Sequence, residues 1–222
     1  TESTNPGIIW IKFWKETWMM SSKPSQYTKG WVEFYKLRFK VTPDVLIPRP
    51  ETELLVDAVL KFSDSLTVLD LGTGTGNIAI SIAKNSKGIK IIATDISEKA
   101  LEIAQQNAKL HGVAERIKFI QSNLLEKVTD PPDIIVTNLP YIPSERIPYL
   151  ESSVKDFEPH IALNGGEDGF KLYRELFKQI KKNGWTPKLI IGEIDYTHGE
   201  LAANEAQKYF PKAQIEVRKD LA

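Results

Sequence analysis

Residues 66–77 read Leu-Thr-Val-Leu-Asp-Leu-Gly-Thr-Gly-Thr-Gly-Asn, and this stretch decides the fold. Its first half, 66–71, is a short apolar run typical of a buried strand, and a helical pattern follows at about 77–85. Glycines between a strand and a helix let the backbone turn sharply and let a ligand approach it closely. The first turn of the helix adds unpaired N–H groups. The stretch therefore predicts a ligand-binding turn at the end of a strand.

The alternation of strand and helix continues along the rest of the chain. Apolar runs that indicate strands follow at 89–94, 116–121, 133–137, 188–194 and 213–218. Helical patterns lie between them, at about 98–111, 168–182 and 198–209. Continuous apolar strands separated by helices indicate an α/β protein with a doubly wound, mostly parallel sheet.

The beginning of the chain has a different pattern. Trp10, Trp14 and Trp18 recur at i, i+4 and i+8, which predicts a helix over 8–20. Such a helix would either bind a partner or pack on its own protein. The stretch 21–25 interrupts the pattern and is interpreted as a linker.

A β-hairpin and a stiff connector are predicted next. Residues 31–42 alternate between apolar and polar side chains. Three prolines within 43–50 favour an extended connector, and a helix should run from about Glu51 to Phe62. We therefore divide the chain into an N-terminal helix and linker (1–25), a hairpin and connector to a helix (26–62), and the main α/β domain (63–222).

The composition excludes several classes of function. The 222 residues include 29 Lys and Arg against 29 Asp and Glu, whereas proteins that bind the nucleic-acid backbone carry a basic excess. The absence of cysteine excludes disulfides, thiolate metal sites and cysteine nucleophiles, and the three widely spaced histidines do not suggest a metal site. The chain has neither an apolar run long enough to span a bilayer nor a signal-peptide cleavage site. We expect a cytoplasmic protein without a metal.

Asp95 ends the second predicted strand of the α/β domain, 23 residues after Gly72. In nucleotide-binding α/β folds an acid at this point accepts hydrogen bonds from ribose hydroxyls, although Asp95 could instead cap the helix that follows Ser97. The G-x-G-x-G spacing differs from the G-x-G-x-x-G of dinucleotide-binding proteins, which argues against a nicotinamide dehydrogenase. Together with Asp70, it resembles the first motif of class I methyltransferases, which bind S-adenosylmethionine. By that resemblance, the cofactor would be bound by Asp95 and by the glycine-rich turn, which consists of Gly72, Thr73, Gly74, Thr75 and Gly76.

The tetrapeptide Asn138-Leu139-Pro140-Tyr141 follows the fourth of these strands and should face the same crevice. It resembles the fourth motif of methyltransferases that act on planar nitrogens. An amide nitrogen is a poor nucleophile because its lone pair is delocalised. The side-chain oxygen of Asn138 and the backbone carbonyl of Leu139 could accept both N–H hydrogens, while Tyr141 packs on the planar group. Such positioning supplies much of the rate of a transfer. By itself, the tetrapeptide could also be a polar turn that ends a strand.

Two further segments, 43–53 and 157–169, together with Gln26-Tyr27, resemble the peptide chain release factor glutamine methyltransferases from about residue 23 onward. The resemblance implies a cytoplasmic enzyme of translation termination. It would transfer a methyl group from S-adenosylmethionine to the glutamine of the Gly-Gly-Gln motif in class I release factors, leaving S-adenosylhomocysteine. Residues 63–222 would be the catalytic domain. The protein would be a monomer without a membrane anchor or direct nucleic-acid contact.

The resemblance also assigns roles to individual residues. Asn123 and Leu124, after the third strand, would lie beside the adenine. Asn138 would contact both the cofactor and the acceptor amide, which Leu139, Pro140 and Tyr141 would also hold. We expect two further segments, Glu158-Pro159 and Pro48-Arg49-Pro50, to wall the pocket without a chemical role.

The chain departs from the family pattern at four places. Leu139 replaces the usual proline, which leaves the carbonyl in place but makes the loop less stiff. Asn123 replaces the usual aspartate, so adenine recognition would change in detail. We expect residues 1–25 to be the remnant of a larger helical substrate-recognition domain, and the last strand of the family to be missing.

Alternative functions remain open from the sequence. Asn-Leu-Pro-Tyr also occurs in ribosomal RNA adenine dimethyltransferases, although these tend to be basic and their resemblance does not extend to the 43–53 segment. A ribosomal protein glutamine methyltransferase would use the same chemistry. A non-catalytic module that only binds the cofactor is the third alternative.

Overall fold

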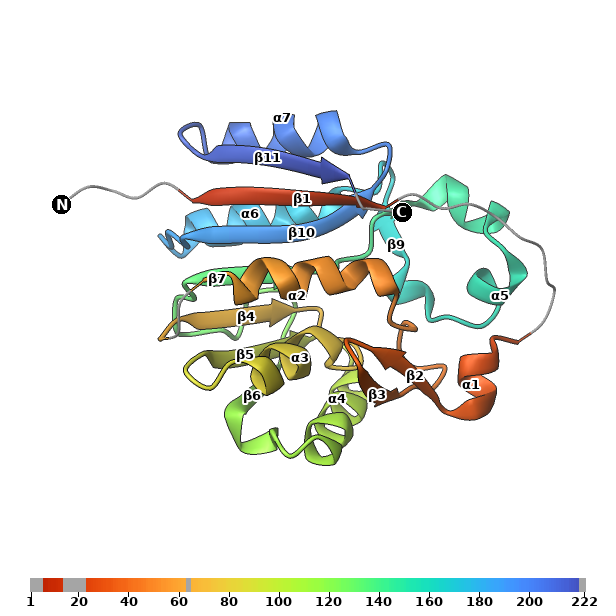
Figure 1. Ribbon diagram of the computed structural model, residues 1–222. Coiled ribbons are helices and arrows are strands. Elements are labelled where there is room, and N and C mark those ends of the chain that lie inside the picture. The colour runs from red at the N-terminus through yellow and green to blue at the C-terminus, as the bar shows by residue number, and fades with distance from the viewer. Residues whose placement is uncertain (1–5, 14–22, 63–64, 220–222) are drawn as a thin grey trace.

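The computed structural model describes residues 6–13, 23–62 and 65–219 (Figure 1). Within these ranges the chain forms a seven-stranded sheet in the order β11-β1-β10-β7-β4-β5-β6, in which all neighbouring strands are parallel. The six strands predicted from residue 66 onward are confirmed as β4 (Thr67–Leu71), β5 (Lys90–Asp95), β6 (Ile117–Gln121), β7 (Ile134–Thr137), β10 (Leu189–Asp195) and β11 (Gln214–Lys219).

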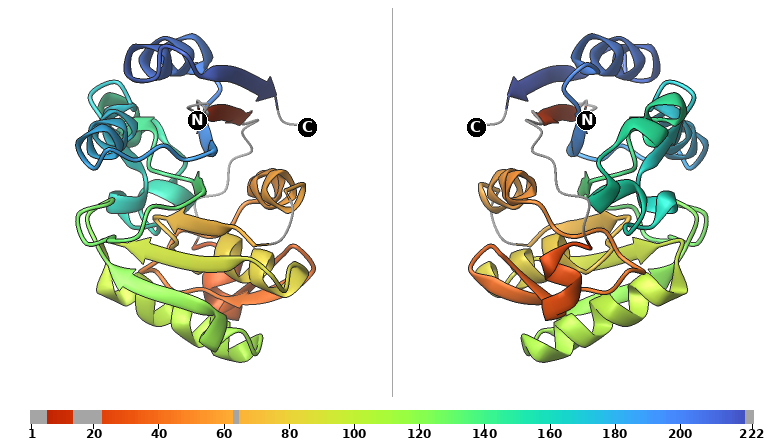
Figure 2. Two further views of the ribbon diagram at one scale, coloured as in Figure 1. Left: turned by 90° about the vertical axis from the view of Figure 1, so that its left-hand side faces the viewer. Right: turned by 90° about the vertical axis from the view of Figure 1, so that its right-hand side faces the viewer.

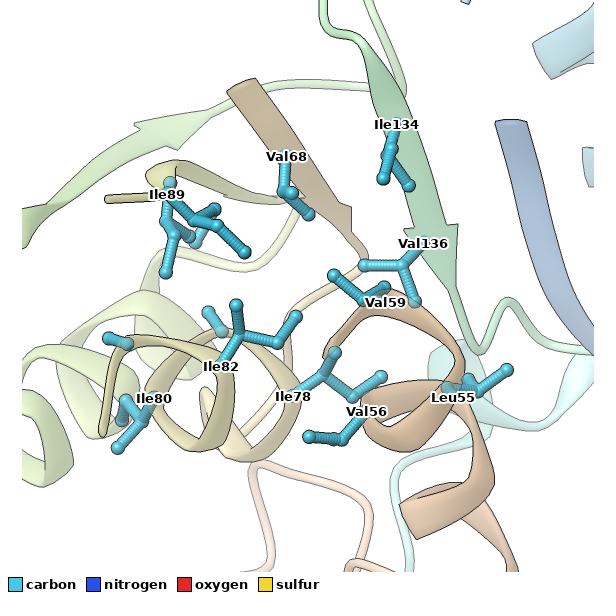
Figure 3. Packing of buried hydrophobic residues seen from close by; sticks show 14 of the residues in the cluster. Leu55, Val56, Val59, Val68, Ile78, Ile80, Ile82, Ile89, Ile134 and Val136 are labelled. Atoms are coloured by element: carbon cyan, nitrogen blue, oxygen red, sulfur yellow. The ribbon is translucent and has the colours of Figure 1, made fainter. Parts of the chain in front are cut away.

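Helices cover both faces of the sheet, which confirms the doubly wound fold (Figure 2). One face carries α2 (Glu53–Leu60), α3 (Asn77–Asn85) and α4 (Glu98–Leu110), and the other carries α6 (Lys171–Lys182) and α7 (Gly199–Tyr209). Successive residues of a strand point to opposite faces. Val68 therefore packs with Val59 and Ile78 in one core (Figure 3), while Leu69 lies in the other.

The helix predicted over 8–20 is wrong for its first half, because Gly7–Phe13 forms strand β1. This strand pairs with both β10 and β11, with Ile8 opposite Ile190 and Ile215. A short apolar run cannot be assigned to helix or strand by periodicity alone, and its three isoleucines favour a strand. Trp14 and Trp18, like the rest of 14–22, lie outside the described residues.

Trp10 explains how β1 is held in the sheet. Its side chain is fully buried against the rings of Phe170, Tyr173 and Phe177 on the α6 side. A Cβ atom on the neighbouring Gly192 would lie only 2.5 Å from the Trp10 ring, so the glycine in β10 makes room for the indole.

The predicted hairpin and connector are confirmed. Strands β2 (Trp31–Phe34) and β3 (Leu37–Lys40) pair antiparallel across Tyr35 and Lys36, which both have positive φ as a tight hairpin turn requires. The short helix α1 (Ser25–Lys29) precedes them. The extended connector leads through a turn of 3-10 helix, η1 (Pro50–Thr52), into α2.

The 3-10 helix η2 (Ala114–Arg116) lies between α4 and β6, and the other short elements lie after β7. They are β8 (Ile142–Pro143), η3 (Ser144–Tyr149), α5 (Ser152–Lys155), η4 (His160–Ala162) and β9 (Asn164–Gly166), of which β8 and β9 pair parallel. Figure 1 shows α1, the hairpin and α5 on the side to which the strand arrows point. None of the helices in the described ranges is long and apolar enough to cross a membrane.

The order of the strands predicts where a ligand binds. From β4 the chain moves outward to β5 and β6, and then returns to β7 on the other side of β4. In open α/β sheets the crevice lies outside the carboxyl ends of the strands at such a reversal. The turns after β4 and β7, which carry the glycines and Asn138, both lie there.

Candidate active site

A cavity lies at the carboxyl ends of β4, β5 and β7. It brings together three regions that are far apart in the sequence: residues 72–75, Asp95, and residues 138–140. Asn123 and Leu124 also line it, so ten of the twelve predicted site residues share one cavity. The two that do not line it are Gly76 and Tyr141.

The glycine-rich turn has the backbone conformation that requires glycine. Gly72, Gly74 and Gly76 have φ values of 73°, 55° and 80°. A Cβ on Gly74 would meet nothing within 4 Å, so this residue leaves the turn open to the cavity. A Cβ on Gly76 would lie 2.8 Å from Ile80 and 3.2 Å from Ala104, so Gly76 serves helix packing instead.

The buried Asp70 side chain hydrogen-bonds to the glycine-rich turn and to α3. Its Oδ2 atom accepts hydrogen bonds from the Thr73 hydroxyl at 2.6 Å and from the Ala79 N–H at 3.0 Å. Its Oδ1 atom is buried and has no partner among the described residues. Complete burial raises the pKa of Asp70 to about 7, against the lowering effect of the hydrogen bonds from Thr73 and Ala79.

Asp95 connects the turn to the start of α4. One carboxylate oxygen accepts from the Gly74 N–H and the other from the Ser97 N–H, both at 2.9 Å. The cap of α4 is the Ser97 side chain itself, which accepts from the Ala100 N–H at 3.2 Å. Burial raises the pKa of Asp95, although its backbone hydrogen bonds oppose the rise. Asp95 thus contacts both the helix start and the glycine turn, and it lines the cavity.

Asn123 and Leu124 form another part of the cavity wall, after β6. The Asn123 Nδ2 atom donates to Glu126 at 2.8 Å. Leu124 is buried and has a positive φ of 51°, which is unusual for a residue with a side chain.

A second cavity adjoins the first across the tetrapeptide. Asn138, Leu139 and Pro140 line both cavities, whereas Tyr141 lines only the second. The second cavity also receives side chains from β10 and from the segment after β7, among them Glu193, Asp195 and Arg146. A Cβ on Gly72 would lie 3.5 Å from Leu139, so the glycine turn and the tetrapeptide are in contact.

Buried polar side chains surround the tetrapeptide. The Glu193 carboxylate is 2% exposed and accepts hydrogen bonds from the hydroxyls of Thr52 at 2.7 Å and Tyr141 at 3.0 Å. The Asn138 Nδ2 atom donates to the Thr52 Oγ1 atom at 3.3 Å. We did not predict Thr52 or Glu193 as site residues. The one available signal was a charged residue inside the apolar run 188–194.

The two segments expected to wall the pocket meet through an ion pair. The Arg49 guanidinium contacts the carboxylate of Glu158, which also accepts the Ile47 N–H at 3.4 Å. The Glu158 side chain is 1% exposed and the Arg49 side chain 29%. Pro48, Arg49 and Pro159 line the first cavity, whereas Pro50 and Glu158 line neither of the two.

Comparisons with known proteins show the family of the chain. A family model described as a methyltransferase domain matches residues 62–217. The chain is 39% identical over 202 residues to the release factor glutamine methyltransferase of Lactococcus lactis subsp. lactis, covering 90% of this chain and 74% of the relative. It is also 39% identical over 211 residues to the enzyme of that name from Clostridium acetobutylicum, with 90% and 72% covered.

A solved structure shows the same fold. The ribosomal protein L11 methylase from Lactobacillus delbrueckii subsp. bulgaricus superposes with a TM-score of 0.54 and 22% identity, covering 76% of this chain and 73% of that one. From the family model and the two sequence relatives, the chain belongs to the family of release factor glutamine methyltransferases.

Proposed function

We propose that this protein transfers a methyl group from S-adenosylmethionine to the side-chain amide nitrogen of the glutamine in the Gly-Gly-Gln motif of a class I peptide chain release factor. One observation carries the proposal: two adjoining cavities share Asn138, Leu139 and Pro140 as their common wall. A methyltransferase needs its donor and its acceptor side by side, and this wall carries the acceptor groups for an amide.

The first cavity fits S-adenosylmethionine. Its floor is a glycine turn that a Cβ at Gly74 would narrow, and the Thr94 hydroxyl in its lining is buried without a partner among the described residues. The glycine turn would hold the methionine portion, Asp95 the ribose, and Asn123 with Leu124 the adenine. When bound, this cofactor supplies an electrophilic methyl group on a sulfonium.

The tetrapeptide prepares the acceptor nitrogen. The Asn138 Oδ1 atom and the Leu139 carbonyl would each accept one N–H of the glutamine amide, which holds the nitrogen and favours its lone pair for attack. Preorganised acceptors also stabilise the positive charge that develops on nitrogen. The methylated nitrogen then releases a proton to water, so the step requires no strong base from the protein.

The acceptor is a protein in this proposal because the relatives at 39% identity carry release factor in their names. The zero net charge is consistent with a protein acceptor rather than ribosomal RNA. We propose that the 63–222 segment is the catalytic domain and that the enzyme works as a monomer without direct nucleic-acid contact.

Mass spectrometry of a class I release factor tests the proposal. After incubation with this protein and S-adenosylmethionine, the peptide that contains Gly-Gly-Gln should gain the mass of one methyl group on the glutamine. A release factor with glutamate in place of that glutamine is the matched control and should gain none. Methylation of a ribosomal protein glutamine or of ribosomal RNA instead would overturn the release factor assignment. Cofactor binding without any methylated product would support a non-catalytic module.

A further inference from the structure

Glu193 is a buried charged residue to which the mechanism above gives no role. Its place in the fold follows from the register of β10 and β7, in which Gly192 lies opposite Thr137. Glu193 is the next residue on β10 and Asn138 directly follows β7, so the Glu193 side chain comes to lie beside the tetrapeptide. The Glu193 backbone is also held, because its carbonyl accepts a hydrogen bond from the Tyr173 hydroxyl.

The hydrogen bonds around Glu193 have a defined direction. The Thr52 hydroxyl gives its single proton to the Glu193 carboxyl group. The Thr52 oxygen is then left as an acceptor, and only the NH₂ side of the Asn138 amide can bond to it. The amide oxygen of Asn138 therefore points away from Thr52 and remains available for another donor.

We propose that Glu193 is the positioning residue that orients the Asn138 amide, through the hydroxyl of Thr52 and through its own contact with the Asn138 NH₂ group, so that Oδ1 faces the acceptor glutamine. This inference rests on the proposed function, since it concerns the same acceptor site. It gives a role to Thr52, which belongs to the 43–53 segment that otherwise only walls the cavities. Without the carboxylate, the Thr52 hydroxyl could donate its proton to the Asn138 amide oxygen. The amide would then present its NH₂ group to the acceptor glutamine, whose own N–H groups would find no acceptor there.

Opposing influences act on the pKa of Glu193. Burial raises the pKa of Glu193, and the nearby charge of Glu51 adds to the rise, while hydrogen bonds from Thr52, Tyr141 and Asn138 lower it. Burial, and after it the nearby Glu193, raises the pKa of the Tyr141 and Tyr173 hydroxyls, whereas the positive charge of Arg49 acts on Tyr141 in the opposite direction. Both tyrosines therefore stay protonated, and Tyr141 keeps the proton that it donates to Glu193.

Glu193→Gln is the direct test, because glutamine has nearly the same shape but can also donate hydrogen bonds. We expect kcat for release factor methylation to fall about 100-fold, with the Kd for S-adenosylmethionine unchanged. Glu205→Gln is the matched control, since Glu205 is another buried carboxylate, on α7, whose partners are Lys208 and Arg174. That control should keep the wild-type kcat. A kcat for Glu193→Gln within twofold of wild type would overturn the proposal.

Thr52 provides a second pair of variants. Thr52→Val keeps the shape but removes the hydroxyl, and it should lower kcat by less than Glu193→Gln does, whereas Thr52→Ser should recover most of the loss. The Glu193→Gln and Thr52→Val changes should not be additive, because both break one path to Asn138. Additive losses, or no recovery with serine, would contradict the proposed route.

A readout that does not depend on methylation separates this inference from the proposed function. In isotope-labelled protein, the NMR signals of the Asn138 side-chain NH₂ should be slow to exchange with solvent and should become fast in Glu193→Gln. Unchanged signals in the variant would overturn the positioning role even if the wild type methylates release factors. A wild type that shows these signals but no methylation would refute the proposed function alone.

Discussion

The two cavities that meet at Asn138 are built in different ways. The first contains a turn whose three glycines have positive φ and which is fixed by short-range contacts such as Asp70 to Thr73. The second depends on buried charged and polar side chains, including Glu193, that contact partners far away in the sequence. The glycine turn of the donor cavity is therefore encoded locally, whereas the polar groups of the acceptor cavity come together only in the assembled fold.

The largest expected effects are those of one mutation in each cavity, which should change different kinetic properties. Asn138→Ala removes one acceptor for the glutamine amide, so kcat should fall on the order of 100- to 1,000-fold while cofactor affinity changes little. Asp95→Ala should instead weaken cofactor binding by about tenfold or more, with a smaller change in kcat at saturating cofactor. Single-turnover kinetics and calorimetric titration measure the two effects. If both variants lose the same property, the division between donor and acceptor cavities is wrong.

A smaller effect is expected from the ion pair that joins the two wall segments. Arg49→Ala leaves the Glu158 carboxylate buried without its charged partner, which should lower the free energy of unfolding by about 3 kcal/mol. Lys99→Ala is the matched control, because the Lys99–Asp44 pair is exposed and should contribute less than about 1 kcal/mol. Urea unfolding of both variants checks the difference. Equal losses of unfolding free energy in the two variants would show that the buried pair contributes no more to stability than the exposed pair.

The smallest expected effect concerns pH and Asp70, which holds the glycine turn. The pKa of Asp70 is raised by burial to about 7, above its ordinary value, so its contribution to stability is present at low pH and is lost as pH rises through about 7. Asp70→Asn cannot ionise, and its stability relative to wild type should rise by about 2 kcal/mol between pH 5 and pH 8. Thermal unfolding of the two proteins across this range measures the difference. A difference independent of pH would mean that Asp70 is ionised throughout.

The difference between the cavities also explains what could be predicted from the sequence. The glycine turn, Asp95 and Asn138 were predicted correctly as one crevice, because strand ends in a parallel sheet meet at one edge. Thr52 and Glu193 were missed because 141 residues separate them and no spacing rule links them. Glu158 was expected only as a wall, since its partner Arg49 lies 109 residues away.

The error over Gly7–Phe13 has the same physical origin. The tryptophan spacing indicated a helix, but the environment of Trp10 depends on α6 and on Gly192, which lie far along the chain. Long-range packing overrides a weak local preference in such a segment. The α/β alternation from residue 66 was readable because each of those strands has its own apolar run and its own following turn.

The position of β1 has a consequence for how the protein assembles. In this sheet β11 has β1 as its strand neighbour, and β1 in turn needs β10. During synthesis β1 therefore stays without these two strand partners until residues 189–219 have been made. Contacts of such high sequence separation slow folding and prolong the exposure of unpaired strands. We expect closure of this edge of the sheet to be the last and slowest event of folding, after the half that contains the glycine turn has already formed.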